Sequence, residues 1–461
     1  MNAFKKGSLQ HMGRQKPAKL PFTDRQFVAI VLPLFIDRLL QLVVGVADTF
    51  VISFAGEQAV SGVSLVNQFN NVFIFVSTAL ASGGAVIISQ YIGSKNRDKA
   101  GEAGSQLLMA ATVFSLLVSA LIYMIRSGIL HFLFGHVEQA VMDAALTYLA
   151  VTVLSYVGIA VYDAGAAMYR SMGRTRVTMY VSLIYNMVNL VGNVIGVFVL
   201  RAGVLGVAWP TVISRLLGAV IITVLCFNEK NAVVYQKKSI FCFDPEMLKR
   251  VLNVAVPNGV ENGVFQFVKV ALSSIVSLFG TSQIAANGIA QNFWSLSNAF
   301  GNAGSPAFTT VIGQCMGDEN EEAAEYYFHR FDKILALGGL IWNVILQAML
   351  PFVLHFYAVS DETRSLIFWA VLVHNAFGFW LFPYWNSTAA GLRAAGDIRF
   401  TMVTAVFSTV CVRLVLSYLL GVSLGMGLKG VVVAMIADWV VRGGILIWRV
   451  RTGKWKSRRL I

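Results

Sequence analysis

The sequence predicts an all-α polytopic membrane protein with twelve transmembrane helices, arranged as two six-helix lobes that repeat one another. Three observations support this prediction. The chain of 461 residues is 57% hydrophobic and 13% charged, with a mean hydropathy of +0.68, whereas a typical soluble protein is about 25% charged. Its apolar residues form long stretches, and the stretches of the second half repeat those of the first.

Each apolar stretch is long enough to cross a bilayer as a helix, which takes about 20 residues. The first follows a basic segment, but it is too long for the core of a signal peptide and lacks a small-residue cleavage site. We therefore expect it to be retained as a span. The predicted spans are residues 27–53, 60–92, 104–125, 144–168, 178–200, 207–227, 251–279, 284–316, 333–355, 365–392, 400–421 and 430–449.

Lysine and arginine gather in the loops on one side of these spans. If the N-terminus is inside, the inside segments contain 27 of them and the outside loops contain four. Because basic residues mark the cytoplasmic side, we expect an inner (plasma) membrane protein with both termini cytoplasmic. The divisions are a basic N-tail (1–25), an N-lobe (26–227), a cytoplasmic linker (228–250), a C-lobe (251–449) and a basic C-tail (450–461).

The net charge of +13 is thus explained by topology and contact with the lipid bilayer, and no nucleic-acid partner is predicted. The four cysteines lie far apart and the six histidines form no helical ligand pair, so we predict no metal site and no cofactor. No extramembrane segment approaches the length of a catalytic domain, and no glycine-rich phosphate loop occurs. An integral-membrane enzyme is therefore a distant alternative.

The second half of the chain matches the first, without a gap, when the two are aligned at one constant difference in residue number. This difference, which we call the repeat offset, pairs Pro33 with Pro257. Turn glycines and helix prolines have specific backbone roles, so their coincidence is more informative than matching apolar residues. Since each half has an even number of spans, the halves share one orientation and are related by an axis along the membrane normal, as in transporters whose lobes rock. Other pairs at this repeat offset include Gly56 and Gly280, Gln90 and Gln314, and Gly93 and Gly317.

Three carboxylates in the spans are candidates for coupling to a cation. Asp37 and Glu261 each lie four residues after a proline, Pro33 or Pro257, at which the helix can bend, and Asp48 lies further along the first span. A charge inside a bilayer usually faces a cavity, a partner or an ion path. The alternative is that Asp37 and Glu261 merely neutralise basic neighbours. In the twelfth span, Asp438 and Arg442 are four residues apart, which predicts an ion pair between them.

Polar residues also recur at helical spacing in the second, fifth and eighth spans. Facing lipid, such amides would lack hydrogen-bond partners, so they line a wet cavity or bond to one another between helices. We favour a cavity that binds substrate. The candidates are Asn67, Gln68, Asn71, Asn189, Asn193, Asn287, Gln291, Ser295 and Asn298.

The run from Pro33 to Asp48-Thr49, the segment Gln90-Tyr-Ile-Gly93, the loop Arg170-Ser-Met-Gly173 and the duplication together resemble the multidrug and toxic compound extrusion (MATE) family. The resemblance covers residues 20–455. It implies a V-shaped pair of lobes that export small organic, often cationic, compounds in exchange for protons or sodium ions. It also places an ionisable coupling residue at Asp48.

Two departures from the family pattern bear on the coupling ion. Bacterial members have an aspartate where this chain has Asn193, and the tenth span here contains no acidic residue. We therefore favour protons over sodium. A flippase for lipid-linked saccharides, from the same superfamily, is the alternative function; it would need a strongly cationic cavity, and Arg38 and Lys269 are consistent with it. We expect a monomer.

Overall fold

The computed structural model describes residue 17 and residues 20–461 except 358, 457 and 459, so most of the predicted N-tail lies outside the described residues. The described part is helical throughout. The first half contains α1 (Asp24–Ser53), α2 (Glu57–Gly93), α3 (Arg97–Phe134), α4 (Gln139–Thr152), α5 (Ser155–Ser171), α6 (Thr175–Val194), a π-helical turn (Ile195–Val199) and α7 (Leu205–Cys226).

The second half repeats this order. A short α8 (Lys237–Phe241) lies in the linker. It is followed by α9 (Pro245–Val276) with a 3-10 turn (Ser277–Phe279), α10 (Thr281–Ser297), α11 (Ala299–Gly317), α12 (Glu321–His355), α13 (Asp361–Ala394), α14 (Ile398–Phe407), a π-helical segment (Ser408–Leu414), α15 (Val415–Tyr418), a second π-helical segment (Leu419–Ser423) and α16 (Leu428–Arg451).

All predicted spans correspond to helices. Ten described helices are long and apolar enough to cross a membrane, and α4 with α5, bent by 47°, supplies an eleventh. The predicted eighth span is divided at Asn298 into α10 and α11, of 17 and 19 residues. The prediction of an all-helical polytopic protein is therefore confirmed.

Backbone conformation follows the same repeat as the sequence. Gly56 and Gly280 both have positive φ (106° and 89°), and so do Lys95 and Glu319 (62° and 57°), each pair separated by the repeat offset. The repeat offset is one residue shorter for Thr175 and Ile398, where two matching helices start. It has its full value again at residues 195 and 419, where two matching π-helical segments begin. The π-helical segment Ser408–Leu414 lies in this interval, and such segments are typically single-residue insertions into an α-helix.

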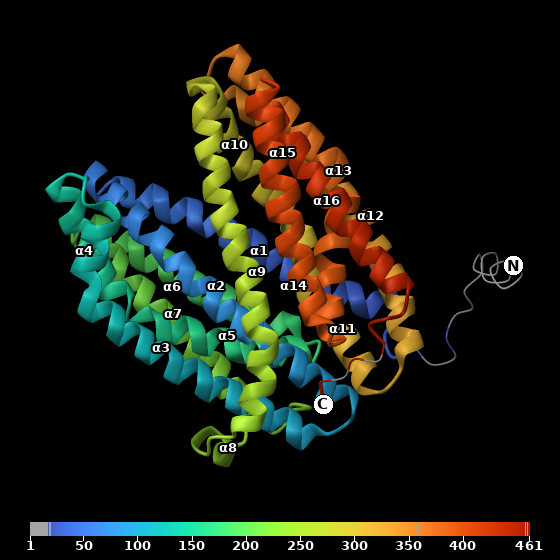
Figure 1. Cartoon of the computed structure of the whole chain (residues 1–461). Helices are drawn as coiled ribbons and strands as arrows, with labels where there is room; N and C mark the ends of the chain where they lie inside the picture. The colour runs from blue at the N-terminus through green and yellow to red at the C-terminus, as the bar shows by residue number, and fades with distance from the viewer. Residues whose placement is uncertain (1–16, 18–19, 358, 457, 459) are drawn as a thin grey trace, which may run out of the picture.

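The two halves form separate bundles that meet at one end and diverge at the other (Figure 1). They meet at the end where α8 and the C-terminus lie, which we call the α8 end. One cluster of buried side chains, which includes Phe27, Phe308 and Phe331, draws on both lobes. Two further clusters belong to one lobe each. The lobes therefore share a core only over part of their length, which gives the V shape.

A reciprocal contact between α2 and α11 joins the lobes. A Cβ placed on Gly93 would lie 2.0 Å from the carbonyl oxygen of Gln314, and one on Gly317 would lie 1.9 Å from that of Gln90. The Gln90 side chain donates to the carbonyl of Ala394 (2.7 Å), and the Gln314 side chain donates to that of Ser171 (2.7 Å). We call these four residues, Gln90, Gly93, Gln314 and Gly317, the clasp.

Other contacts close the same end. Asp24 forms an ion pair with Arg330 (2.6 Å), and the Phe27 ring stacks on Phe331 with centroids 3.7 Å apart. In the predicted C-tail, α16 continues to Arg451 and the Trp455 side chain is fully buried. Lys456 forms an ion pair with Glu325 (2.7 Å). Part of the tail thus packs on its own lobe.

We expect Gly93→Ala to destabilise the protein by about 1–3 kcal/mol, the usual cost of overpacking, because the added methyl group overlaps the Gln314 carbonyl. The measurement is the melting temperature of the purified protein in detergent. Gly128→Ala is the matched control, since a Cβ there meets nothing within 4 Å. Equal melting temperatures for both variants would contradict the clasp.

Candidate functional site

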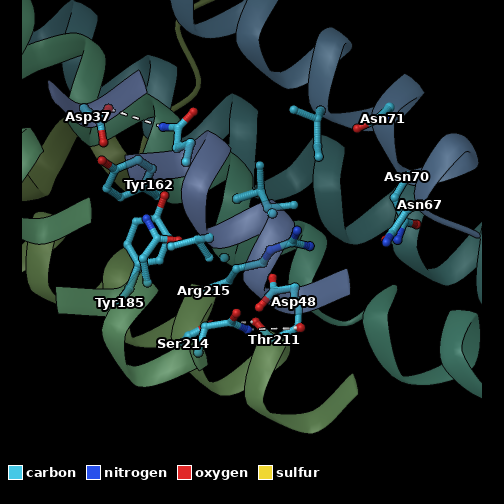
Figure 2. Close-up of a pocket in the computed structure, with 18 of the residues that line it drawn as sticks. Asp37, Asp48, Asn67, Asn70, Asn71, Tyr162, Tyr185, Thr211, Ser214 and Arg215 are labelled. Atoms are coloured by element: carbon cyan, nitrogen blue, oxygen red, sulfur yellow. Dashed lines mark hydrogen bonds between the residues drawn. The ribbon is translucent and has the colours of Figure 1, made fainter. Parts of the chain in front are cut away.

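A cavity of about 540 Å³ lies inside the N-lobe. Helices α1, α2, α4, α5, α6 and α7 supply nearly all of its lining, and the C-lobe contributes Asn302, Ala303 and Pro306 of α11. Figure 2 shows that Asp37 and Asp48, both on α1, are well separated in it. They are eleven residues apart, so about 16 Å of helix separates them. The cavity therefore has two charged regions.

Asp48 lies among the amides of α6. Its Oδ1 accepts a hydrogen bond from the Asn193 side chain (2.8 Å). When the Asn189 nitrogen faces Asp48, it lies 3.1 and 3.2 Å from the two carboxylate oxygens, and the Asn189 oxygen accepts from the Thr211 hydroxyl (3.2 Å). Asn189 and Asn193 are four residues apart and thus on one face of α6. This spacing directs both amides at one carboxylate.

Asp37 occupies the other region. It is buried, and Gln41, one turn later, donates to its Oδ2 (3.3 Å). Its Oδ1 has no hydrogen-bond partner among the described residues. Asp163 of α5 lines the same cavity and accepts from the Ser77 hydroxyl (2.9 Å).

Three arginines balance the three aspartates that line the cavity. Arg38 donates to Gln41 (3.1 Å), and Arg215 of α7 donates to the Ser155 hydroxyl (2.8 Å). Figure 2 shows the Arg215 guanidinium on the same side of the cavity as Asp48. Within the described chain, Asp37, Asp48 and Asp163 form no ion pair with Arg38, Arg170 or Arg215. The six charges balance in number but form no ion pairs with one another, so inside a bilayer they require water or a polar ligand.

The structure brings together only part of the predicted amide set. Asn67, Asn71 and Asn189 line the cavity, and Asn193 reaches it through its bond to Asp48. Gln68 is exposed and lies outside the lining. The predicted polar residues of the C-lobe, on or next to α10, are also absent from the lining: Asn287, Gln291, Ser295 and Asn298.

Asn298 instead contacts His374 of α13, with 3.3 Å between the two side-chain nitrogens. The His374 ring stacks on Trp294 with centroids 5.5 Å apart. These α10 residues therefore join helices within the C-lobe. The two prolines, Pro33 and Pro257, both lie inside continuous helices, α1 and α9.

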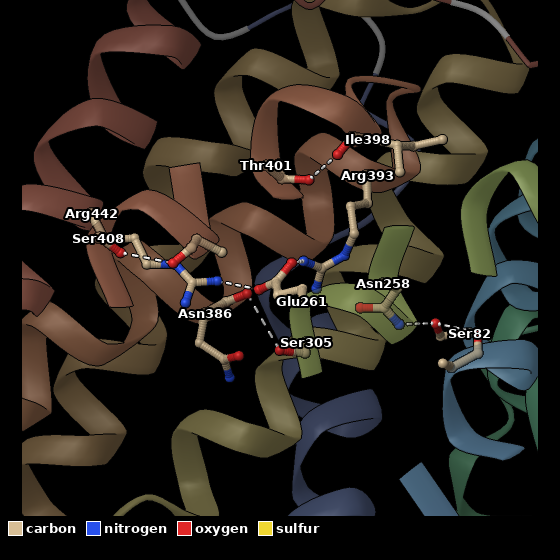
Figure 3. A network of polar contacts seen from close by, with 12 residues as sticks. Ser82, Asn258, Glu261, Ser305, Asn386, Arg393, Ile398, Thr401, Ser408 and Arg442 are labelled. Carbon is tan, nitrogen blue, oxygen red and sulfur yellow. Dashed lines mark hydrogen bonds and ion pairs between the residues drawn. The ribbon is translucent and has the colours of Figure 1, made fainter. Parts of the chain in front are cut away.

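Glu261 has a different environment from Asp48. In Figure 3 its carboxylate lies between two guanidinium groups. It pairs with Arg393 of α13 (3.0 Å) and with Arg442 of α16. The predicted pair between Asp438 and Arg442 is wrong, because Arg442 reaches across to α9 and binds Glu261. Asp438 Oδ1 has no hydrogen-bond partner within the described chain.

Sequence reasoning missed several residues of the cavity. Arg215 and Tyr148 line it beside Asp48, and Thr211 bonds the Asn189 amide. An arginine in a predicted span is itself a functional signal, so Arg215 could have been found. Tyr148 and Thr211 could not, because their residue types are common in helices and only packing directs them inward.

Comparisons with known proteins agree with this geometry. The family model described as MatE matches residues 33–195 and again residues 257–419. The two matched segments begin at Pro33 and Pro257, so they are separated by the offset of the internal repeat. Together they cover more than half of the chain.

Curated relatives match over nearly the full length. The chain is 29% identical to the "Uncharacterized transporter YisQ" of Bacillus subtilis, with 96% of each chain covered. It is 26% identical to the "Probable multidrug resistance protein NorM" of Thermotoga maritima, with 96% of this chain and 95% of that protein covered.

Two solved structures have the same fold. One, titled "Outward-facing conformation of a multidrug resistance MATE family transporter of the MOP superfamily", has a TM-score of 0.84 at 21% identity and covers 94% of this chain and 96% of its own. The other, titled "Crystal structure of MATE in the bent conformation", has a TM-score of 0.84 at 18% identity and covers 93% and 94%. The predicted fold of twelve spans in two lobes is thus confirmed, and the chain belongs to the MATE family of membrane transporters.

Proposed function

We propose that this transporter exports small organic compounds in exchange for a cation, and that Asp48 is the coupling carboxylate. The main support is that Asp48 lines the N-lobe cavity with no ion-pair partner among the described residues. A carboxylate in this setting can change its charge state or ligand without breaking a salt bridge. The relative named as a probable multidrug resistance protein supports export of organic compounds.

The neutral partners of Asp48 support a proton as the coupling ion. The Asn193 amide donates to its Oδ1 (2.8 Å), and the Asn189 amide nitrogen lies 3.1 and 3.2 Å from the two carboxylate oxygens. No acidic residue of α6 is present to share a metal cation with Asp48. A single carboxylate among amides can take up and release a proton, so we favour proton coupling.

The closed end of the molecule supports alternating access. The clasp closes the α8 end, and from the basic loops we propose that this end is cytoplasmic. The cavity is then separated from the cytoplasm by the joined lobes. Transport requires the clasp to open so that cargo can enter from inside, which is alternating access by movement of two lobes.

The other two predicted carboxylates differ in what they can do. Asp37 lines the cavity with one oxygen unpartnered in the described chain, so we propose it as a secondary coupling site. Glu261 is held by two arginines. We propose that its main effect is to hold α9 against α13 and α16.

The cavity chemistry favours an exporter over a saccharide flippase. Three aspartates balance the three arginines of the lining, whereas a pyrophosphate-linked cargo would need a strongly cationic site. Asp48 and the surrounding amides suit a cargo with a basic group.

Asp48→Asn is expected to abolish export driven by an ion gradient while the protein still inserts and folds, because an amide cannot take up and release a proton. The measurement is uptake of a fluorescent organic cation into everted vesicles with an acidic lumen or, separately, a sodium-loaded lumen. Asp143→Asn is the control, since Asp143 is an exposed aspartate on α4. Wild-type uptake by Asp48→Asn would refute the assignment, and uptake driven by sodium alone would refute proton coupling.

Asn193→Leu is expected to slow proton-driven uptake about tenfold, because a hydrogen bond to a charged group contributes about 1.5–3 kcal/mol and the leucine cannot donate to Asp48. Asn375→Leu is the control, because the buried Asn375 amide of α13 donates to Gln347 (3.0 Å) and lies outside the cavity lining. Initial uptake rates in the vesicle assay measure both variants. Equal losses in the two would show that the amide bond to Asp48 is unimportant for coupling.

Glu261→Gln is expected to lower stability by about 3–5 kcal/mol, the cost of removing one partner of a buried ion pair, because Arg393 and Arg442 would both lose their counter-charge. The readouts are the melting temperature and the uptake rate per folded molecule. Glu57→Gln, at an exposed position in the first turn of α2, is the control. An unchanged melting temperature with lost uptake would show instead that Glu261 acts in coupling.

A further inference from the structure

The C-lobe has basic residues where the N-lobe has its coupling site. At the repeat offset that pairs Pro33 with Pro257, Asp48 corresponds to Leu272. Arg413 lies in the π-helical segment through which this offset regains its full value, and at the full offset it corresponds to Asn189. Gly45, which lines the N-lobe cavity, corresponds to Lys269. One lobe thus presents a carboxylate with amides, and the other presents two cations.

Lys269 and Arg413 lie close together although they come from different helices. The Arg413 guanidinium lies over the ring of Phe265, with 5.6 Å between Cζ and the ring centroid. Lys269 follows Phe265 by one turn of α9 and so lies on the same face of that helix, next to the ring that Arg413 covers. The π-helical segment Ser408–Leu414 contains Arg413 and packs against α9.

Neither Lys269 nor Arg413 forms an ion pair in the part of the chain that the structure describes. Arg413 Nε is buried there without a hydrogen-bond partner. Asp438 of α16 forms no ion pair with Arg413, and Glu261 of α9 is shared by Arg393 and Arg442. A cation pair inside the bilayer is costly unless it faces water or binds an anion.

Lys269 is exposed on α9. It lies one turn after Phe265, and therefore on the same side of the helix. Phe267, which is 73% exposed, lies about 160° around the helix from Lys269. The ammonium group is thus accessible on the face of α9 that carries Phe265.

We propose that Lys269 and Arg413 form a binding site for the acidic group, a carboxylate or sulfonate, of an organic molecule whose aromatic part contacts Phe265. Arginine and lysine both donate charge-assisted hydrogen bonds to such groups. This inference rests on the proposed function, because it describes the cargo of the same transporter. The cargo would then carry both an acidic and a basic group, with the acidic group bound by the C-lobe and the basic group by the N-lobe.

Equilibrium binding of two matched dyes tests the proposal without any ion gradient. The dyes are a rhodamine with a free carboxylate and its methyl ester, which differ only in the acidic group. Fluorescence polarisation measures the affinity of each for the purified protein in phosphatidylcholine nanodiscs. The variants are Lys269→Met and Arg413→Gln, and Lys429→Met, which removes a cation next to Trp369 at the start of α16, is the control.

We expect Lys269→Met and Arg413→Gln each to weaken binding of the carboxylate dye about tenfold, the effect of losing one charged hydrogen bond, with the ester unchanged. The control should bind both dyes as the wild type does. Equal weakening of both dyes, or no change in either, would overturn the site. Lys269→Glu gives an independent check, since it should reverse the preference in favour of the ester.

The acidic group could also belong to a lipid. Nanodiscs that contain phosphatidylglycerol distinguish this source: if the lipid displaces the carboxylate dye from the wild type, the site binds headgroups and the assignment to cargo is overturned.

The Asp48→Asn variant separates this proposal from the coupling proposal. This variant should lose gradient-driven uptake and still bind the carboxylate dye more tightly than the ester. Loss of that difference in affinity would contradict independent recognition by the two lobes.

Discussion

The close approach of α2 and α11 at the pseudo-two-fold axis is the constraint on which the rest of this structure depends. Only a hydrogen atom fits at Gly93 and Gly317, because each faces the carbonyl of a glutamine on the other helix. The two glutamine side chains then reach the ends of α13 and α5 in the opposite lobes. Since the contact is reciprocal, one small surface joins the lobes at a single end. The lobes are free to diverge elsewhere, and the N-lobe cavity takes only Asn302, Ala303 and Pro306 of its lining from the other lobe.

The repeat preserves backbone geometry more strictly than chemistry. Left-handed residues recur at matching positions in the two halves, including the non-glycine pair Lys95 and Glu319. The charged residues do not match in the same way. Asp37 lines a cavity, whereas its counterpart Glu261 is held by Arg393 and Arg442. Helix packing requires the same shape in both lobes, but a site needs its particular charges in only one of them, so the lobes can diverge in function while they stay alike in fold.

Charges inside the bilayer are stabilised in two ways in this molecule. Glu261 and its two arginines neutralise one another in a buried network, and such a network resists change because removal of any partner leaves an uncompensated charge. The three aspartates of the N-lobe cavity bond instead to amides and hydroxyls, those of Asn193, Gln41 and Ser77. Neutral partners of this kind allow a carboxylate to gain or lose a proton at small cost. The first arrangement suits a fixed structure and the second suits a transport site.

The sequence by itself determined the all-helical membrane fold, the spans, the duplication and the family, because these follow from hydropathy, span length and turn residues that act locally. It also identified Asp48 and Asp37 as candidates for a cavity or an ion path. Tertiary packing decided the rest. It placed Arg215, Tyr148 and Thr211 beside Asp48, directed Arg442 to Glu261 and away from Asp438, and left the α10 amides outside the cavity. These choices depend on the rotation of each helix against its neighbours, which the order of residues along one helix does not specify.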